Sequence, residues 1–214
     1  MNTVINRDWY IPFRKSPRRL LFDSPYRLRF ELGGEVHENT TAPVPRFIQA
    51  LERCRAVADA VFASSEQVIA VVGSSPEPAR DFYAPTKDSF AALYAMGFRL
   101  SPMAEWKASL DDVDLDDDDE PPASFLWRAF DITGSPASRD VLLWSSVTYE
   151  MPIQPAAPVI PFLADTRRGI LLRVYDDRGM DVTATAVEPL LPIYRSFDRW
   201  LLDYDRERMR AAFG

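Results

Sequence analysis

Two short segments near the C-terminal end of the chain concentrate carboxylates and guanidinium groups beside aromatic rings. One runs from Tyr175 to Val182 (YDDRGMDV) and the other from Trp200 to Arg208 (WLLDYDRER). Clustered aspartates can hold a divalent cation through their oxygens, or can raise one another's pKa until one serves as a general acid. The candidate site residues in these segments are Tyr175, Asp176, Asp177, Arg178, Asp181, Trp200, Asp203, Tyr204, Asp205 and Arg206.

The same residues also fit a structural role. Aspartates stabilise turns by accepting hydrogen bonds from nearby backbone, and arginines neutralise them. Asp203 and Asp205 are two residues apart on an expected helix, so they point to different faces, which weakens a paired-carboxylate mechanism. We therefore expect the two segments to dock on each other through an arginine–carboxylate network, in which Arg178 or Arg206 binds an aspartate. A double-mutant cycle on Asp177 and Arg206 would test whether these two residues touch. No catalytic residue is assigned, and no metal site is expected.

Other catalytic and metal sites lack the residues that they need. The only histidine is His37 and the only cysteine is Cys54, so a histidine-rich metal site, a Cys/His zinc site and an internal disulfide are excluded. Cys54 lies on a helical stripe that we expect to be buried, where cysteines are usually inert. The turn that begins at Gly73 lacks the lysine of a phosphate-binding loop. We predict no cofactor.

The acidity of the chain is local. The formal net charge is -7, and residues 111–120 (DDVDLDDDDE) hold eight acidic side chains, so the rest of the chain is close to neutral. The block resembles a calcium loop in spacing, but Asp117 stands where the glycine is needed and Ala123 where the glutamate is needed. We predict a mobile acidic loop at 111–122. Its charge disfavours a nucleic-acid partner and favours a basic protein partner.

Hydrophobic patterning predicts the elements that position these residues. Leu28, Phe30 and Leu32 alternate with charged residues, which indicates a strand with one buried face. Apolar positions three and four residues apart indicate a helix that carries Cys54. The stretch 98–110 is left unassigned. The expected elements in the first two thirds are a strand at 26–32, a helix at 44–62, a strand at 67–72, a helix at 89–97 and a strand at 124–132.

The final third predicts a three-stranded antiparallel meander, because its apolar runs are separated by short turns that contain Asp and end in Gly. The expected strands are 159–164, 170–175 and 180–184, followed by helices at 189–197 and 198–212. The stretch 139–149 fits either a strand or a helix, since its apolar residues match both periods. The whole chain, 1–214, is predicted to be a single α+β domain, an antiparallel sheet with helices packed on one side.

Three segments resemble a bacterial protein family called domain of unknown function 3885. They are the YDDRG-hydrophobic-Asp turn, the aromatic-x-x-DYDR close and the segment PYRLRFELG at 25–33. The resemblance reaches most of the chain and implies a bacterial origin, but it brings no activity. It favours a helix at 139–149. It also selects Arg29 and Glu31, on the polar face of the first expected strand, as candidate binding residues.

The absence of a signal peptide and of an apolar run of about 20 residues predicts a cytoplasmic protein without a membrane span. The missing catalytic residues and the concentrated acidity favour a non-enzymatic protein-interaction module, for example an immunity-type inhibitor of a basic toxin. The alternative is a small hydrolase or ligand-binding enzyme that uses the aspartates of the 175–181 hairpin and the 200–206 helix. Oligomeric state stays open.

Overall fold

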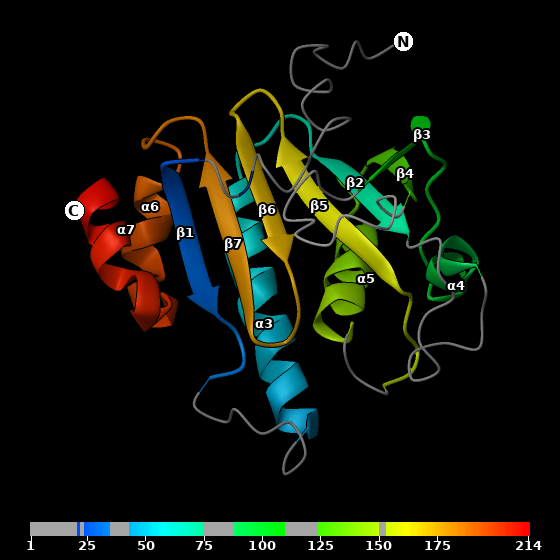
Figure 1. Ribbon diagram of the computed structural model, residues 1–214, viewed down its shortest axis with the longest axis horizontal. Coiled ribbons are helices and arrows are strands. Elements are labelled where there is room, and N and C mark those ends of the chain that lie inside the picture. The colour runs from blue at the N-terminus through cyan, green and yellow to red at the C-terminus, as the bar shows by residue number, and fades with distance from the viewer. Residues whose placement is uncertain (1–20, 22–23, 35–42, 75–87, 110–123, 150–152) are drawn as a thin grey trace, which may run out of the picture.

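The protein is described here by a computed structural model, in which residues 21, 24–34, 43–74, 88–109, 124–149 and 153–214 are placed (Figure 1). These residues form one seven-stranded sheet with the strand order β1-β7-β6-β5-β2-β4-β3, and all of its neighbouring strands are antiparallel. The strands are β1 (Tyr26–Glu31), β2 (Ile69–Ser74), β3 (Ala104–Ser109), β4 (Ser124–Asp131), β5 (Val159–Asp165), β6 (Ile170–Val174) and β7 (Gly179–Ala184).

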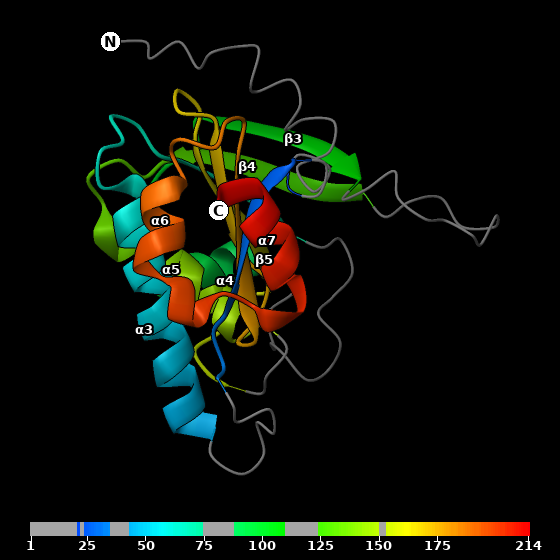
Figure 2. The same ribbon diagram turned by 90° about the vertical axis from the view of Figure 1, so that its left-hand side faces the viewer.

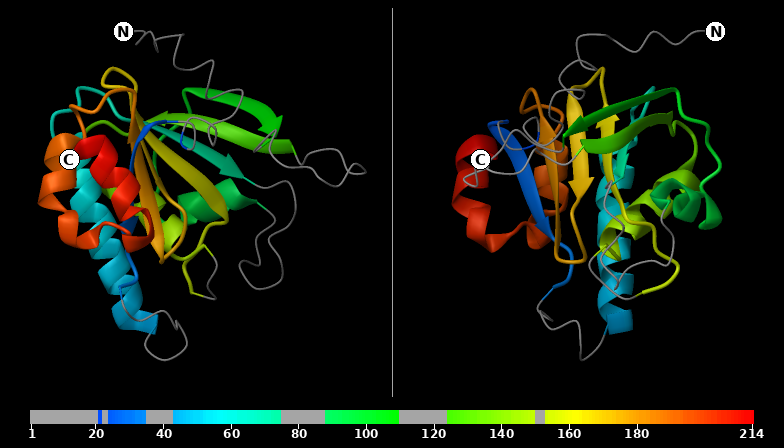
Figure 3. Two further views of the ribbon diagram at one scale, coloured as in Figure 1. Left: turned by 60° about the vertical axis from the view of Figure 1, so that its left-hand side comes forward. Right: turned by 45° about the vertical axis from the view of Figure 1, so that its right-hand side comes forward.

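The sheet brings the two ends of the described chain together. β5, β6 and β7 form the expected meander, and β1 joins it by pairing with β7. The N-terminal strand and the C-terminal hairpin, which are far apart in the sequence, therefore lie side by side. Right-handed strand twist accumulates from β1 to β3, so the strands at the two ends of the sheet run in very different directions (Figure 3).

The helices cover one face of the sheet (Figure 2). They are α3 (Pro43–Phe62), α4 (Ser89–Ala95), α5 (Pro136–Val147) and α6 (Leu191–Ser196). The main core lies between them and the sheet, and it includes Phe30 and Cys54, both fully buried. Residues 139–147 of the ambiguous stretch 139–149 are thus helical, as the resemblance suggested. The predicted α+β class, with helices on one side of an antiparallel sheet, is confirmed.

A second, smaller core lies on the opposite face, around Trp127 of β4 and Phe162 of β5. Every residue of β2, an interior strand between β5 and β4, is buried as a result. Gly73 of β2 is required there, because a Cβ at this position would lie 2.8 Å from the indole ring of Trp127. Gly73 and Ser74, at the start of the segment considered as a phosphate-binding loop, are therefore part of a strand that packs against a tryptophan.

Two expectations about elements change. Residues 98–110, which were left unassigned, contain β3 at the edge of the sheet. The single helix expected at 198–212 is wrong: the chain forms two short 3-10 turns, η1 (Asp198–Trp200) and η2 (Asp203–Asp205), and then α7 (Arg206–Phe213). Consequently there is no helix at 200–206.

The helix is interrupted because the free edge of β1 needs partners. Leu201 forms a β-bridge with Phe30, and the backbone amide of Leu202 donates to the carbonyl oxygen of Arg29 at 2.8 Å. An edge strand otherwise leaves such groups unpaired. α7 then covers the same edge, where Nη2 of Arg208 donates to the carbonyl oxygen of Arg27 at 3.2 Å. His37 and the acidic segment 111–122 lie outside the described residues.

Candidate functional site

The hairpin between β6 and β7 contains the first of the predicted aspartates, and its role is local. Oδ1 of Asp176 accepts from the backbone amide of Arg178 at 2.7 Å, and Oδ2 accepts from the guanidinium of the same residue. Asp176 is almost fully buried, whereas the Arg178 side chain is largely exposed. This pair closes the turn on itself, as an aspartate does when it bonds backbone two residues ahead.

Asp177, the next residue, pairs with an arginine that sequence analysis did not select. Nε of Arg46, in the first turn of α3, donates to Oδ2 of Asp177, and both side chains are at least 96% buried. Gly33 makes room for this pair, because a Cβ there would overlap the Arg46 guanidinium. Among the described residues, Nη1 of Arg46 has no hydrogen-bond partner.

The pairing of Arg46 has a weak signal in the sequence. Arg46 is four residues before Ala50 and eleven before Val57, both fully buried, so it occupies the apolar stripe of its helix. A charged residue at such a position calls for a buried partner of opposite charge. The pair of Asp177 and Arg206 does not form, because Asp177 binds Arg46 in the core.

Asp181 and Asp205 are joined by Arg29. Nε of Arg29 lies 3.0 Å from Oδ1 of Asp181, and its Nη1 lies 2.7 Å from Oδ2 of Asp205. Burial raises the pKa of Asp181, against the opposing charges of Arg29 and Arg27. Partial burial acts in the same direction on Asp205, but the hydrogen bond and charge of Arg29 outweigh it and hold the pKa of Asp205 below its usual value.

Arg29 thus connects the two C-terminal segments that we expected to dock on each other. It carries the expected arginine–carboxylate network from β7 to η2, through a third segment, β1. Tyr175 lies at the same cluster, and its pKa is raised by burial first and then by the charge of Asp181. Phe30, on the other face of β1, packs into the main core.

The remaining predicted residues of the C-terminal segment are on the surface. Nε of Arg206 donates to Oδ1 of Asp203 at 2.8 Å, and its Nη1 lies 3.0 Å from Oδ1 of Asp198. The side chain of Asp203 is 92% exposed, and that of Tyr204 is 89% exposed. These contacts stay within the segment 198–206 and do not reach the hairpin.

The predicted aspartates therefore do not converge on one point. Asp176, Asp177 and Asp181 each face a different arginine, contributed by the turn itself, by α3 and by β1. Within the described part of the chain, no three His, Cys, Asp or Glu residues are grouped so that they could hold a metal ion. What the arrangement does is fasten β1, α3 and η2 to the β6–β7 hairpin.

Cys54 is buried as the helical stripe predicted. It is 0% exposed, and its thiol donates to the carbonyl oxygen of Leu51 at 3.2 Å. Burial raises the pKa of Cys54 to about 12. Because the thiolate is the reactive form of cysteine, this side chain is unsuited to nucleophilic catalysis.

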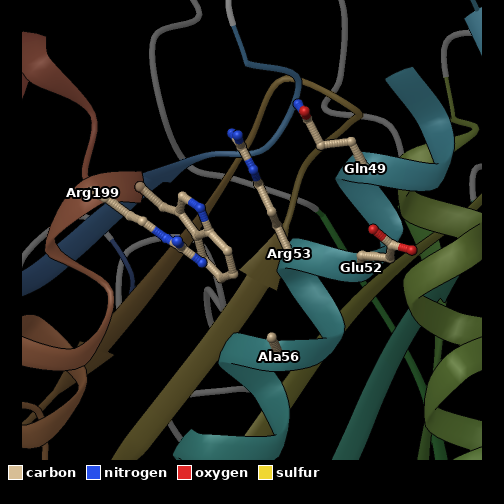
Figure 4. Close-up of a pocket in the computed structure, with 6 residues that line it drawn as sticks. Gln49, Glu52, Arg53, Ala56 and Arg199 are labelled. Carbon is tan, nitrogen blue, oxygen red and sulfur yellow. The ribbon is translucent and has the colours of Figure 1, made fainter. Parts of the chain in front are cut away.

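A groove of about 570 Å³ lies between α3 and η1 (Figure 4). Of its residues, only Trp200 was selected from the sequence. The guanidinium carbon of Arg53 lies 5.6 Å from the centre of the Trp200 ring, and that of Arg199 lies 4.9 Å from it. The groove is lined by Gln49, Glu52, Arg53, Ala56, Arg199 and Trp200.

The candidate Glu31 lies at the end of β1 next to this groove, where its carbonyl oxygen accepts from Nη1 of Arg53 at 3.1 Å. Sequence analysis had no signal for Arg53 and Arg199, because their convergence depends on how α3 packs beside the segment after α6. Two smaller cavities, of about 150 and 160 Å³, lie elsewhere, beside Tyr175 and beside Arg139.

Comparison with known proteins places the chain in a family. Neither the curated proteins nor the solved structures gave a match. None of the described helices is both long enough and apolar enough to span a membrane. Residues 8–205 match the family described as Domain of unknown function (DUF3885). This range includes two of the segments on which the resemblance was noticed and all of the third, the aromatic-x-x-DYDR close, except Arg206. The chain, from before β1 to the end of η2, therefore belongs to the DUF3885 family.

Proposed function

We propose that this protein is a non-enzymatic interaction module of the bacterial cytosol, which binds a basic protein through its acidic segment. The observation that carries the proposal is the pairing of the hairpin aspartates. Each buried carboxylate of the hairpin is paired with a different arginine, so these three aspartates stabilise the structure. This supports an interaction module over a small hydrolase, which needs carboxylates that converge on a substrate.

The acidic segment supplies the attraction. Residues 111–120 lie outside the described residues and connect, in the sequence, β3 to β4, the two strands at the end of the sheet opposite β1. Eight acidic side chains in ten residues create a local field that draws a positively charged surface and speeds its association. An immunity-type inhibitor of a basic toxin is one concrete form of such a module.

The test compares the wild-type protein with a charge-neutralised variant, in which the seven aspartates of 111–120 become asparagine and Glu120 becomes glutamine. A partner captured by the wild-type protein is purified, and its association and dissociation rates are measured between about 50 and 500 mM salt. Exposed charges are screened beyond about 8 Å at physiological ionic strength. We expect salt to slow association much more than it speeds dissociation, and neutralisation to remove most of this dependence.

A matched control changes exposed acidic residues at the other end of the molecule, with Asp203→Asn and Glu207→Gln together. This variant should keep the wild-type salt dependence. An association rate that is insensitive to salt, or equal in the wild-type and neutralised proteins, would remove the acidic segment from the function. Catalytic turnover of a small substrate that is lost in Asp181→Asn, with the fold intact, would favour the hydrolase instead.

A further inference from the structure

We propose that the groove between α3 and η1 binds an acidic segment of a partner protein, with a carboxylate held between Arg53 and Arg199. This site lies next to β1, because Nη1 of Arg53 donates to the carbonyl oxygen of Glu31. The acidic segment 111–120 is attached at β3 and β4, on the opposite edge of the sheet. The inference therefore goes beyond the proposed function, and either can fail without the other.

The first argument is charge. Two guanidinium groups approach one indole ring, that of Trp200. Among the described residues, neither Arg53 nor Arg199 forms an ion pair with a carboxylate, although most of the other arginines there do. Burial lowers the pKa of Arg53, and the charge of Arg199 lowers it further, against the opposing charge of Glu31. A bound carboxylate would offset this repulsion and accept charge-assisted hydrogen bonds from both arginines.

The groove has one carboxylate of its own, on Glu52, which is exposed. In Figure 4 its carboxylate points away from Arg199, while the side chains of Arg53 and Arg199 lie on the same side of α3. The Glu52 carboxylate is therefore turned away from the side of α3 on which the two arginines lie. Gln49, on the same helix, adds an amide that can donate to a bound carboxylate or backbone carbonyl.

The second argument is the apolar surface that continues the groove along α3. Val44 is 64% exposed and Ile48 is 51% exposed. They are four residues apart, and the same spacing leads on to Glu52 and Ala56 in the groove, so all four share one side of the helix. At 1.5 Å per residue this strip is about 18 Å long. Exposed aliphatic side chains beside a cationic site suit a ligand that carries both aliphatic and acidic side chains.

The third argument decides the class of ligand. Pockets for small molecules enclose most of the ligand surface, whereas this groove is bounded by one helix and one short turn and continues along the helix. Tryptophan and arginine are the residue types that contribute most at protein interfaces, and Trp200 with its two arginines supplies both. An extended protein segment can occupy the strip and the groove at once, and a free anion cannot.

The test selects binders from a displayed library of random twelve-residue peptides. The full-length protein is the target, and the variant with both Arg53→Gln and Arg199→Gln is used to remove peptides that bind elsewhere. We expect the selected peptides to be rich in Asp and Glu next to Leu, Ile, Val or aromatic residues. A selected peptide is then synthesised, and its dissociation constant is measured by fluorescence anisotropy.

Each single variant, Arg53→Gln or Arg199→Gln, should raise the dissociation constant of the peptide by about tenfold or more, since a hydrogen bond between charged groups is lost. Arg210→Gln, which changes an exposed arginine of α7, should leave the affinity unchanged. Arg199→Gln separates binding from folding, because Arg199 is exposed and its side chain forms no hydrogen bond with the described residues. Thermal unfolding of each variant checks the fold.

Three results would overturn the proposal. The first is selection of basic or uncharged peptides, or of none. The second is binding that both arginine variants retain. The third is a different occupant of the groove. This occupant would be inorganic phosphate if phosphate binds there and no acidic peptide does. It would be a second copy of this chain if sedimentation shows a dimer that Arg199→Gln dissociates.

Discussion

Nε of Arg29 on β1 lies 3.0 Å from Oδ1 of Asp181 on β7, at the register position where the two residues face each other across the strands. The Asp181 side chain is 2% exposed, whereas that of Arg29 is 23% exposed. The ion pair is therefore largely shielded from water on its acidic side. It ties the N-terminal strand to the C-terminal hairpin, and Asp205 extends it to η2.

The first prediction concerns this pair. Arg29→Gln should destabilise the protein by about 3 kcal/mol, because a buried carboxylate loses its partner. Asp181→Asn should cost less, since the partly exposed arginine can turn toward water or Asp205. In a double-mutant cycle measured by urea unfolding, the two changes should be coupled by at least about 1 kcal/mol. Asp203→Asn, at an exposed position, is the control and should change stability by less than about 0.5 kcal/mol. Additive effects of the Arg29 and Asp181 changes would contradict the coupling.

The second prediction concerns the buried pair of Arg46 and Asp177. Asp177→Asn should cost about 3 to 5 kcal/mol, because it leaves an uncompensated charge in the core. Replacing both residues by apolar ones, with Arg46→Met and Asp177→Leu together, should cost less than either single change. Chemical denaturation of the wild-type protein, of Asp177→Asn, of the single variants Arg46→Met and Asp177→Leu, and of the double variant tests this. A double variant less stable than both single variants would show that the ion pair itself stabilises the fold.

The third prediction concerns acid. The pKa of Asp205 is held below its ordinary value of 3.8. Its contribution to stability is therefore complete above pH 3.8 and is lost as pH falls through the lower, folded-state pKa. Asp131 is shifted in the same direction, because the hydrogen bonds from Thr133 outweigh partial burial. Asp181 has the opposite effect on stability. Burial raises its pKa, so its contribution to the free energy of unfolding falls as pH rises above 3.8.

Denaturation midpoints measured from about pH 2 to pH 6 should therefore fall less steeply on the acid side in the variant with Asp131→Asn and Asp205→Asn than in the wild-type protein. Asp181→Asn should steepen the dependence, since it removes the opposing contribution. Asp203→Asn serves as the exposed control. Parallel curves for all four proteins would mean that these carboxylates do not govern the response to acid.

The fourth prediction concerns Cys54. With its pKa raised to about 12 and its side chain fully buried, the thiol should resist alkylation by iodoacetamide at about pH 8 in the native protein. It should react fully after unfolding in urea. Mass spectrometry of the alkylated chain measures both, and rapid labelling of the native protein would show that α3 opens readily around Cys54.

Much of the fold follows from the sequence alone. Alternation of apolar and charged residues located β1, a stripe at spacings of three and four located α3 with Cys54 inside, and the Asp- and Gly-containing turns located the meander of β5, β6 and β7. These patterns are readable because each reflects the geometry of a few neighbouring residues against one buried face. The Asp176 turn belongs to the same class, since both partners lie within two residues.

The tertiary structure alone decided the partners of the other charged residues. Asp177 binds Arg46 at a separation of 131 residues, and the chain breaks its last helix at Leu201 because the edge of β1 is there to be paired. Arg53 and Arg199 meet only because α3 packs beside η1. The sequence around a carboxylate does not determine which of several arginines it will bind. The path of the whole chain determines which arginine lies beside it. Burial then excludes water, which would otherwise compete for the carboxylate.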